Sequence, residues 1–212
     1  MEKFKGLDEE KQQKILDASL KEFAEHGYEK ASTNRMVKEA GIGKGMLFYY
    51  FNSKKDLYEY LVEYSLDFTV EKYFNQVDTS ETDFIERLKQ TAQVKMKAQT
   101  ENRNVFNFLS TYMLSTEIKV PARLQKKYEY MQEMGNRMIY EGIDLSLFRD
   151  DVNVEKAFKL IRWSIEGYQN ELLHSLQGQN MAQVDFAPYW EEFYAYMEIL
   201  KKSFYKEGER EQ

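Results

Sequence analysis

The chain has 212 residues, no cysteine and a net charge of −6, and 42% of its residues are hydrophobic. This length and apolar content predict a folded protein of one large domain or two small ones, and the lack of cysteine excludes disulfides and thiolate metal sites. The sequence has neither a signal-peptide pattern nor the run of about eighteen apolar residues that a membrane span needs. We therefore expect a cytoplasmic protein that does not cross a membrane.

Apolar residues recur at helical spacing from the start of the chain, and only two prolines interrupt it. The first helix is expected from about Asp8 to His26, where Gly27 follows as a C-terminal cap. Two short helices, at about 33–40 and 44–50, are separated by a glycine turn. "SKKD" then has the pattern of a capping box that starts a longer helix at about 54–74.

The polar segment at 75–83 separates this part from a second set of helices. We expect these helices near 83–100, 103–117, 121–142, 153–177 and 186–206. The predicted fold class is all-α: a compact N-terminal unit of short helices followed by a helical bundle. We place the boundaries at 1–53 for the first domain, 54–74 for a connecting helix and 75–212 for the bundle.

The segment "AGIGKGMLFYYFNSKKDL", residues 40–57, combines three glycines, four aromatic residues and three lysines. It is not a phosphate-binding loop, because Gly45 stands where the hydroxyl residue after Lys44 would be needed, and a helix precedes it where a dinucleotide motif needs a strand. Residues 31–56 carry five basic and two acidic side chains, a local net charge of +3. A short helix, a glycine turn and a second short helix form a helix-turn-helix, whose second helix enters the major groove of DNA.

Residues 15–63, "ILDASLKEFAEHGYEKASTNRMVKEAGIGKGMLFYYFNSKKDLYEYLVE", closely resemble the DNA-binding domain of the TetR (tetracycline-repressor-type) family. The resemblance implies a three-helix helix-turn-helix domain that binds double-stranded operator DNA. It implies Thr33 and Lys54 as phosphate contacts, Lys44 and Met46 as base readers, and Gly45 as the point of close approach. The full set of implied DNA-binding residues is Thr33, Asn34, Arg35, Lys44, Gly45, Met46, Phe48, Tyr49, Tyr50 and Lys54.

Two residues depart from the family pattern. Gly43 stands where Ser is frequent, which removes a hydroxyl, and Phe48 stands where Tyr is common. The expected recognition helix therefore has few hydrogen-bonding side chains, and contacts to thymine methyl groups and DNA shape would carry much of the specificity. Leu47 and Phe51 are expected in the core, and Tyr49, Tyr50, Lys44 and Lys54 on an exposed face.

The helix expected at 153–177 has two apolar stripes, whereas a surface helix needs only one. Leu160 and Ser164 belong to the stripe expected in the core, and the second stripe suggests a partner. The resemblance implies that this helix and the last one pair with their copies in a homodimer. The candidate interface residues are Trp163, Gly167, Asn170, His174, Trp190, Phe193, Tyr194 and Met197. Burial within one chain is the alternative.

Aromatic residues and methionines in the middle helices suit an apolar pocket for a small inducer, as the resemblance implies, but such a stripe is also typical of a plain core. Arg162 and Glu166 either contact the ligand or pair with each other four residues apart. The candidate ligand residues are Phe106, Tyr112, Met113, Tyr130, Met134, Met138, Arg162 and Glu166.

A helical-bundle di-iron enzyme is the alternative function, because Glu171 and His174 have Glu-x-x-His spacing. That site requires a second such motif, and His26, the other histidine, lacks the spacing. We therefore expect no metal, no cofactor and no catalysis. The sequence predicts a ligand-responsive transcriptional regulator, most simply a repressor that binds a palindromic operator as a dimer and is released by a partly hydrophobic inducer.

Overall fold

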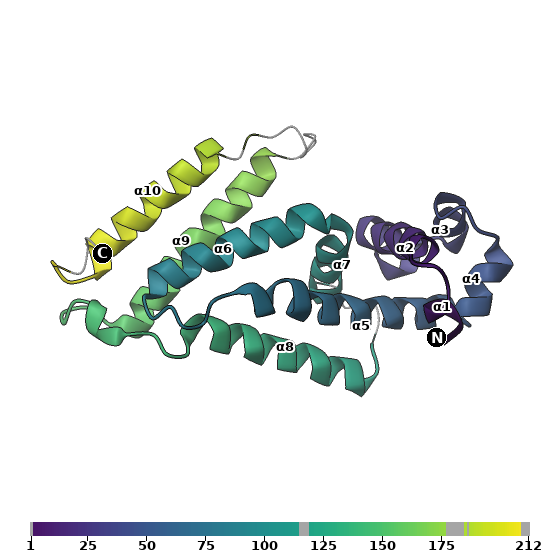
Figure 1. Ribbon diagram of the computed structural model, residues 1–212, viewed down its shortest axis with the longest axis horizontal. Coiled ribbons are helices and arrows are strands. Elements are labelled where there is room, and N and C mark those ends of the chain that lie inside the picture. The colour runs from purple at the N-terminus through teal and green to yellow at the C-terminus, as the bar shows by residue number, and fades with distance from the viewer. Residues whose placement is uncertain (1, 115–118, 177–184, 186, 209–212) are drawn as a thin grey trace. The chain divides into compact units, whose positions relative to one another are not determined.

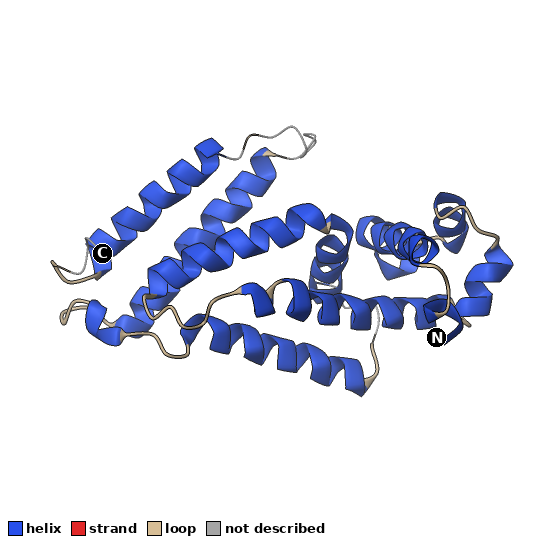
Figure 2. Ribbon diagram, in the orientation of Figure 1, coloured by secondary structure: helices blue, strands red, loops and turns tan. Residues whose placement is uncertain are grey.

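The computed structural model describes residues 2–114, 119–176, 185 and 187–208, which form helices joined by turns and loops (Figures 1 and 2). The α-helices are α1 (Glu2–Lys5), α2 (Glu9–Lys30), α3 (Thr33–Glu39), α4 (Lys44–Tyr50), α5 (Lys54–Lys72), α6 (Phe84–Glu101), α7 (Arg103–Leu114), α8 (Ala122–Tyr140), α9 (Val154–Ser175) and α10 (Ala187–Phe204). Single 3₁₀ turns lie at Phe74–Gln76 and Leu145–Leu147. The all-α prediction is confirmed, whereas α1 was not predicted.

Polar caps fix where several helices begin. Ser53 Oγ accepts a hydrogen bond from the amide of Asp56 at 3.0 Å, so the predicted capping box starts α5. Asp8 and Asn153 cap α2 and α9 in the same way. At the end of α3, Gly41 has a φ of 67°, a left-handed conformation that favours glycine. The helices beyond residue 83 begin and end within a few residues of the predicted bounds, and the end expected at 117 lies outside the described residues.

The end of α2 differs from the prediction. Gly27 leaves the helical conformation, with a φ of 67°, as expected of a C-terminal glycine, but helical turns resume and reach Lys30. The chain therefore bends at Gly27 and does not stop there. Tyr28, directly after the bend, lies 5.1 Å from Tyr58 between ring centroids. This contact of Tyr28 with the α5 ring holds the extra turn against the core.

The chain divides into two compact units, Met1–Gln76 with Lys95–Asn136, and Val77–Val94 with Arg137–Gln212. In the first unit, α7 packs against α2 and α5. Phe23, Tyr58 and Phe108, from these three helices, lie 5.0 to 6.1 Å apart between ring centroids. The core of the N-terminal helices is thus completed by a helix from beyond residue 100, so the compact units do not follow a division at residue 75.

The start of α3 is held by a carboxylate from α2. Glu22 is 5% exposed, accepts a hydrogen bond from the Ser32 amide at 2.7 Å and pairs with the guanidinium of Arg35. Ser32 itself caps α3 with no side-chain hydrogen bond, so Glu22 satisfies an amide at the helix start. Burial alone would raise the pKa of Glu22, but the hydrogen bonds from Arg35 and Ser32 outweigh it and lower that pKa.

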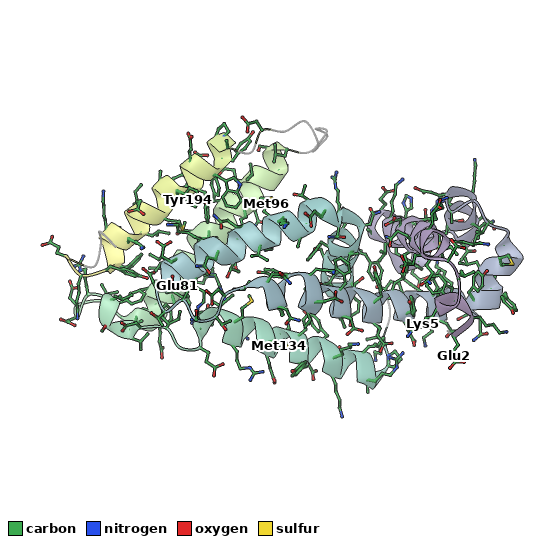
Figure 3. The ribbon with its side chains drawn as sticks, in the orientation of Figure 1. Glu2, Lys5, Glu81, Met96, Met134 and Tyr194 are labelled. Atoms are coloured by element: carbon green, nitrogen blue, oxygen red, sulfur yellow. The ribbon has the colours of Figure 1, made fainter. Side chains whose placement is uncertain are left out.

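A buried arginine organises the second unit. Arg87, on α6, is fully buried, and its guanidinium donates to the carbonyls of Thr79 at 2.8 Å and Glu141 at 2.5 Å, as well as to those of Glu81 and Met138. Figure 3 labels Glu81 in the loop that leads into α6. Arg87 therefore ties this loop to the C-terminal end of α8, where carbonyl groups lack helical partners and favour a cation.

Replacing Glu22 with Gln should destabilise the protein by about 2 kcal/mol at neutral pH, because the ion pair with Arg35 is lost in a buried position. The lowered pKa means that ionised Glu22 stabilises the fold fully above its ordinary value of 4.5 and progressively less as the pH falls below it. Urea unfolding across this range should show the difference between wild type and Glu22→Gln shrinking in acid. Glu25→Gln, an exposed change on α2, should stay within about 0.5 kcal/mol. A pH-independent difference would contradict this account.

Replacing Arg87 with Met should lower the free energy of unfolding by at least about 3 kcal/mol, because several carbonyls lose a charged donor. Arg137→Met, which removes an exposed arginine from α8, is the matched control and should change stability by less than about 0.5 kcal/mol. Both are measured by urea unfolding monitored by circular dichroism. Equal stability of the two variants would show that Arg87 does not hold the loop.

Candidate nucleic-acid interface

Helices α3 and α4 form a helix-turn-helix with a packed inner side. Met36 and Val37 of α3 and Leu47 of α4 are buried, and so is Phe51 directly after α4. The amide of Ile42 donates to the carbonyl of Val37 at 3.0 Å, which closes the turn after Gly41. The prediction that Leu47 and Phe51 lie in the core is confirmed. With this side fixed, the opposite side of α4 is left facing outward.

The outward side of α4 carries the residues expected to meet DNA. Lys44 and Gly45 are exposed, Met46 is 39% exposed and Tyr49 is 55% exposed. Phe48 is half-buried, in agreement with a packing role. On α3, Asn34 is exposed and Thr33, the first residue of the helix, is half-buried. This side of α4 thus offers an ammonium group, a phenol, a thioether and bare backbone within six residues.

Tyr50 does not belong to this face. It is 6% exposed, and its ring lies 6.1 Å from that of Phe4 in an edge-to-face arrangement. The expectation that Tyr49 and Tyr50 are both exposed is therefore wrong for Tyr50. The reason is α1, which brings Phe4 against the C-terminal end of α4 and covers the second tyrosine.

Two of the expected cations are engaged within the chain. Arg35 pairs with Glu22 and donates to the Lys30 carbonyl at 3.1 Å. Lys54 donates to the Glu29 carbonyl at 3.2 Å, and its ammonium lies 4.8 Å from the Tyr28 ring centroid. Both residues must exchange these partners, or share them, if they contact phosphate. Their main contribution here is to hold α3 and α5 against the end of α2.

No contact with the described part of the chain requires a glycine at position 45. A Cβ atom built at Gly45 would meet nothing within 4 Å, and its backbone is not in the left-handed region. Glycine inside a helix costs about 1 kcal/mol relative to alanine. Gly45 therefore makes α4 less stable and leaves its outward side flat, which permits close approach of another molecule.

Helices α9 and α10 carry the residues predicted for an interface, and the structure separates these into two groups. Trp163, at 56% exposure, Gly167, Asn170 and His174 lie exposed on α9. Phe193 and Met197 are 2% and 1% exposed, so the prediction that they form an interface is wrong: they fill the core of the second unit.

The other two predicted interface residues are half-buried on α10. Trp190 and Tyr194 stack at 5.9 Å between ring centroids, and the Tyr194 hydroxyl accepts a hydrogen bond from Gln93 of α6. Figure 3 labels Tyr194 on α10.

The sequence analysis did not identify other exposed residues of α9 and α10. Leu160 and Ser164 of α9 were expected in the core, but Leu160 is 47% exposed and Ser164 is also exposed. Tyr196 and Ile199 of α10 are apolar residues with 43% and 58% exposure. Ser164 and Glu171 of α9 line an open hollow of about 340 Å³ together with Tyr196 and Ile199. Their helical spacing was visible in the sequence, but which stripe faces inward depends on how α9 packs.

The predicted ligand residues fall in both units. In the first, Phe106 is buried, Tyr112 is half-buried with its ring 5.9 Å from Tyr128, and Met134 is half-buried, whereas Met113 and Tyr130 are 43% and 55% exposed. In the second, Met138 is buried, and Arg162 donates to the Tyr140 hydroxyl at 3.3 Å. Arg162 Nε also lies 3.4 Å from a carboxylate oxygen of Glu166, so the pairing alternative is realised.

The residues behind the enzyme alternative, Glu171 and His174, are both exposed on α9. Within the described part of the chain, no three histidine, aspartate or glutamate side chains gather as a metal site would require. No helix among the described residues has the length and apolar character needed to cross a membrane.

Comparison with known proteins agrees with this geometry. Residues 15–61 match the family model described as bacterial regulatory proteins, tetR family. An HTH-type transcriptional regulator of Staphylococcus aureus is 23% identical over 176 residues, which cover 78% of this chain and 91% of that protein.

Solved structures share the fold. A TetR family transcriptional regulator from Chloroflexus aurantiacus has a TM-score of 0.69 and 22% identity, covering 97% of this chain and 98% of its own. The regulator FadR from Bacillus subtilis, in complex with stearoyl-CoA, has a TM-score of 0.53 and 16% identity, covering 89% and 96%. Residues 15–61 thus form a helix-turn-helix domain of the tetR family, with α3 and α4 as its two short helices, and the chain as a whole shares the fold of TetR family transcriptional regulators.

Proposed function

We propose that this protein is a ligand-responsive repressor that binds a palindromic operator as a homodimer and releases it when a small, partly hydrophobic molecule binds. The observation that carries the proposal is the outward side of α4, where Lys44, Gly45, Met46 and Tyr49 are exposed. We assign residues 1–53 to DNA reading, 54–74 to the connection and 75–212 to ligand binding and dimerisation. The protein would act in the cytoplasm, on chromosomal DNA.

In this proposal α4 lies in the major groove and its first residues meet the base edges. The Lys44 ammonium donates to guanine acceptors, Met46 contacts thymine methyl groups, and Gly45 lets the helix backbone approach. Thr33 and Asn34, at the start of α3, and the Tyr49 hydroxyl bind the phosphate backbone and set the register. Phe48 and Tyr50 support α4 from inside, and Arg35 and Lys54 reach phosphate only by sharing their present partners.

The dimer would form through the exposed faces of α9 and α10. Leu160, Trp163, Tyr196 and Ile199 expose large apolar side chains there, and exposed apolar patches of this kind mark interaction sites. Gly167 lies in the middle of this face, and a Cβ there would meet nothing within 4 Å, so a closely approaching partner helix explains the glycine. Asn170 and His174 are exposed further along α9, whereas Trp190 and Tyr194 are half-buried on α10 and pack against the core of the second unit.

The ligand proposal rests on the apolar residues of α7 and α8. Phe106, Tyr112 and Met134 are the buried or half-buried members of the predicted set in the first unit. FadR, which shares the fold, was solved with stearoyl-CoA, a ligand that joins a long apolar acyl chain to a polar, charged coenzyme A group. A ligand that binds the released state more tightly by about 1.4 kcal/mol weakens operator binding about tenfold.

Replacing Gly45 with Leu separates folding from DNA binding. A Cβ atom at this position meets nothing within 4 Å and leucine favours the helix over glycine, so the free energy of unfolding should stay equal or rise by up to about 1 kcal/mol. Operator affinity should fall at least tenfold, about 1.4 kcal/mol, because the side chain fills the space that the duplex would occupy. Fluorescence anisotropy on DNA upstream of the protein's own gene, against random DNA, measures the affinity.

The matched control for Gly45→Leu is Asn136→Leu, which places the same side chain on the exposed surface of α8. It should bind DNA like wild type. Selective binding that survives Gly45→Leu would place the DNA contact elsewhere on the molecule. Absence of any selective binding by wild type, including in a selection from random sequences, would overturn the repressor proposal.

Replacing Trp163 with Glu should raise the dimer dissociation constant at least tenfold, because a carboxylate would be buried in the apolar interface. Tyr130→Glu is the control, since Tyr130 lies on α8 with 55% exposure against 56% for Trp163. Sedimentation equilibrium measures the association and circular dichroism the helical content, which both variants should keep. If Trp163→Glu and Tyr130→Glu associate like wild type, the α9–α10 face is not the interface.

A further inference from the structure

Helix α1 lies against the end of the predicted recognition helix. Phe4 is fully buried, with ring centroids 6.1 Å from Tyr50, 4.9 Å from Phe51 and 5.5 Å from Tyr60. Tyr50 ends α4, Phe51 follows it and Tyr60 belongs to α5. One aromatic side chain therefore fixes α1 to both helices. Lys3 and Lys5 flank Phe4 in the sequence of this single helical turn. The anchoring of Phe4 therefore also fixes the positions of both lysines.

Lys3 extends over the outward side of α4. Its ammonium lies 4.2 Å from the ring centroid of Tyr49, within the range of a cation–π interaction. Both residues are exposed, so the ring covers only one side of the ammonium and the rest faces solvent. Tyr49 is among the residues that we assign to the DNA backbone, and the ring thus holds a positive charge beside that contact.

This charge matters because other cations near α4 are engaged by the chain itself. Arg35 is paired with Glu22, and Lys54 with the Glu29 carbonyl and the Tyr28 ring. Aromatic contact leaves the charge of Lys3 unneutralised, whereas the carboxylate of Glu22 neutralises that of Arg35. Two exposed positive charges therefore lie beside the outward side of α4. Lys44 is at the start of α4, and Lys3 of α1 lies over Tyr49 near its end.

We propose that α1 is part of the DNA-reading surface: Phe4 anchors it to α4, and Lys3, guided by the Tyr49 ring, binds a backbone phosphate at the edge of the groove that α4 enters. The proposal rests on the proposed function. A phosphate contact adds affinity for every sequence, so Lys3 sets binding strength and register but not base preference.

The salt dependence of DNA binding tests the proposal. Each phosphate contact contributes about 0.9 to the slope of log affinity against log salt, so Lys3→Gln should reduce the slope by about 1.8 when two copies bind one duplex. The loss should be equal on random DNA and on the DNA upstream of the gene, and Lys3→Arg should restore the slope. Lys126→Gln, which removes an exposed lysine from α8 of the same unit, should leave the slope unchanged.

A second variant tests the anchor. Phe4→Ala frees α1 while keeping Lys3, and should lower the slope as Lys3→Gln does, with no further fall when the two are combined. Urea unfolding verifies that the variant is folded under the binding conditions. If wild type binds selectively and Lys3→Gln keeps its slope, the role of Lys3 is wrong and the repressor proposal stands. If wild type shows no DNA binding on either duplex, both proposals fall together.

Discussion

Glu22 is a carboxylate almost removed from water, and α3 is held to α2 through it. Its carboxylate accepts hydrogen bonds from the amide of Ser32, directly before α3, and from the guanidinium of Arg35. Because α3 leads through the Gly41 turn directly into α4, the direction of α4 depends on this hold. Leu47 and Phe51 fix α4 from inside and Phe4 fixes its end, so the outward side is oriented from three directions. A site that must match a DNA groove requires this rigidity.

Two glycines lie inside helices at positions where none of the described residues requires a glycine. Gly45 in α4 and Gly167 in α9 both have open space where a Cβ would stand, and each weakens its helix. They lie in the two surfaces that we assign to partners from outside the chain, DNA for α4 and a second copy for α9. Each glycine destabilises its helix and stabilises nothing else that the structure describes. The absence of a side chain is explained if it lets the backbone of a binding partner approach the helix closely.

Local signals in the sequence predicted most of the helices. The features that the sequence did not predict depend on contacts between residues far apart in the chain. Ser53, Gly41 and the apolar spacing placed the helices because capping and periodicity act within a few residues. Helix α1 was missed because the burial of Phe4 depends on rings some fifty residues away in the chain. The same holds for Arg35, whose partner Glu22 is thirteen residues distant, and for Phe193 and Met197, since the side of α10 that faces inward is set by packing.

Among the described residues, the hydrogen bonds of the Arg87 guanidinium go to backbone carbonyls. Its guanidinium donates hydrogen bonds to the carbonyls of residues 79, 81, 138 and 141, and every amino acid has such a carbonyl. Arg87 thus holds the loop before α6 through groups that do not depend on the side chains of residues 79 and 81. A substitution at residue 79 or 81 keeps the carbonyl group that Arg87 binds, whereas a substitution of Arg87 removes all of these hydrogen bonds at once.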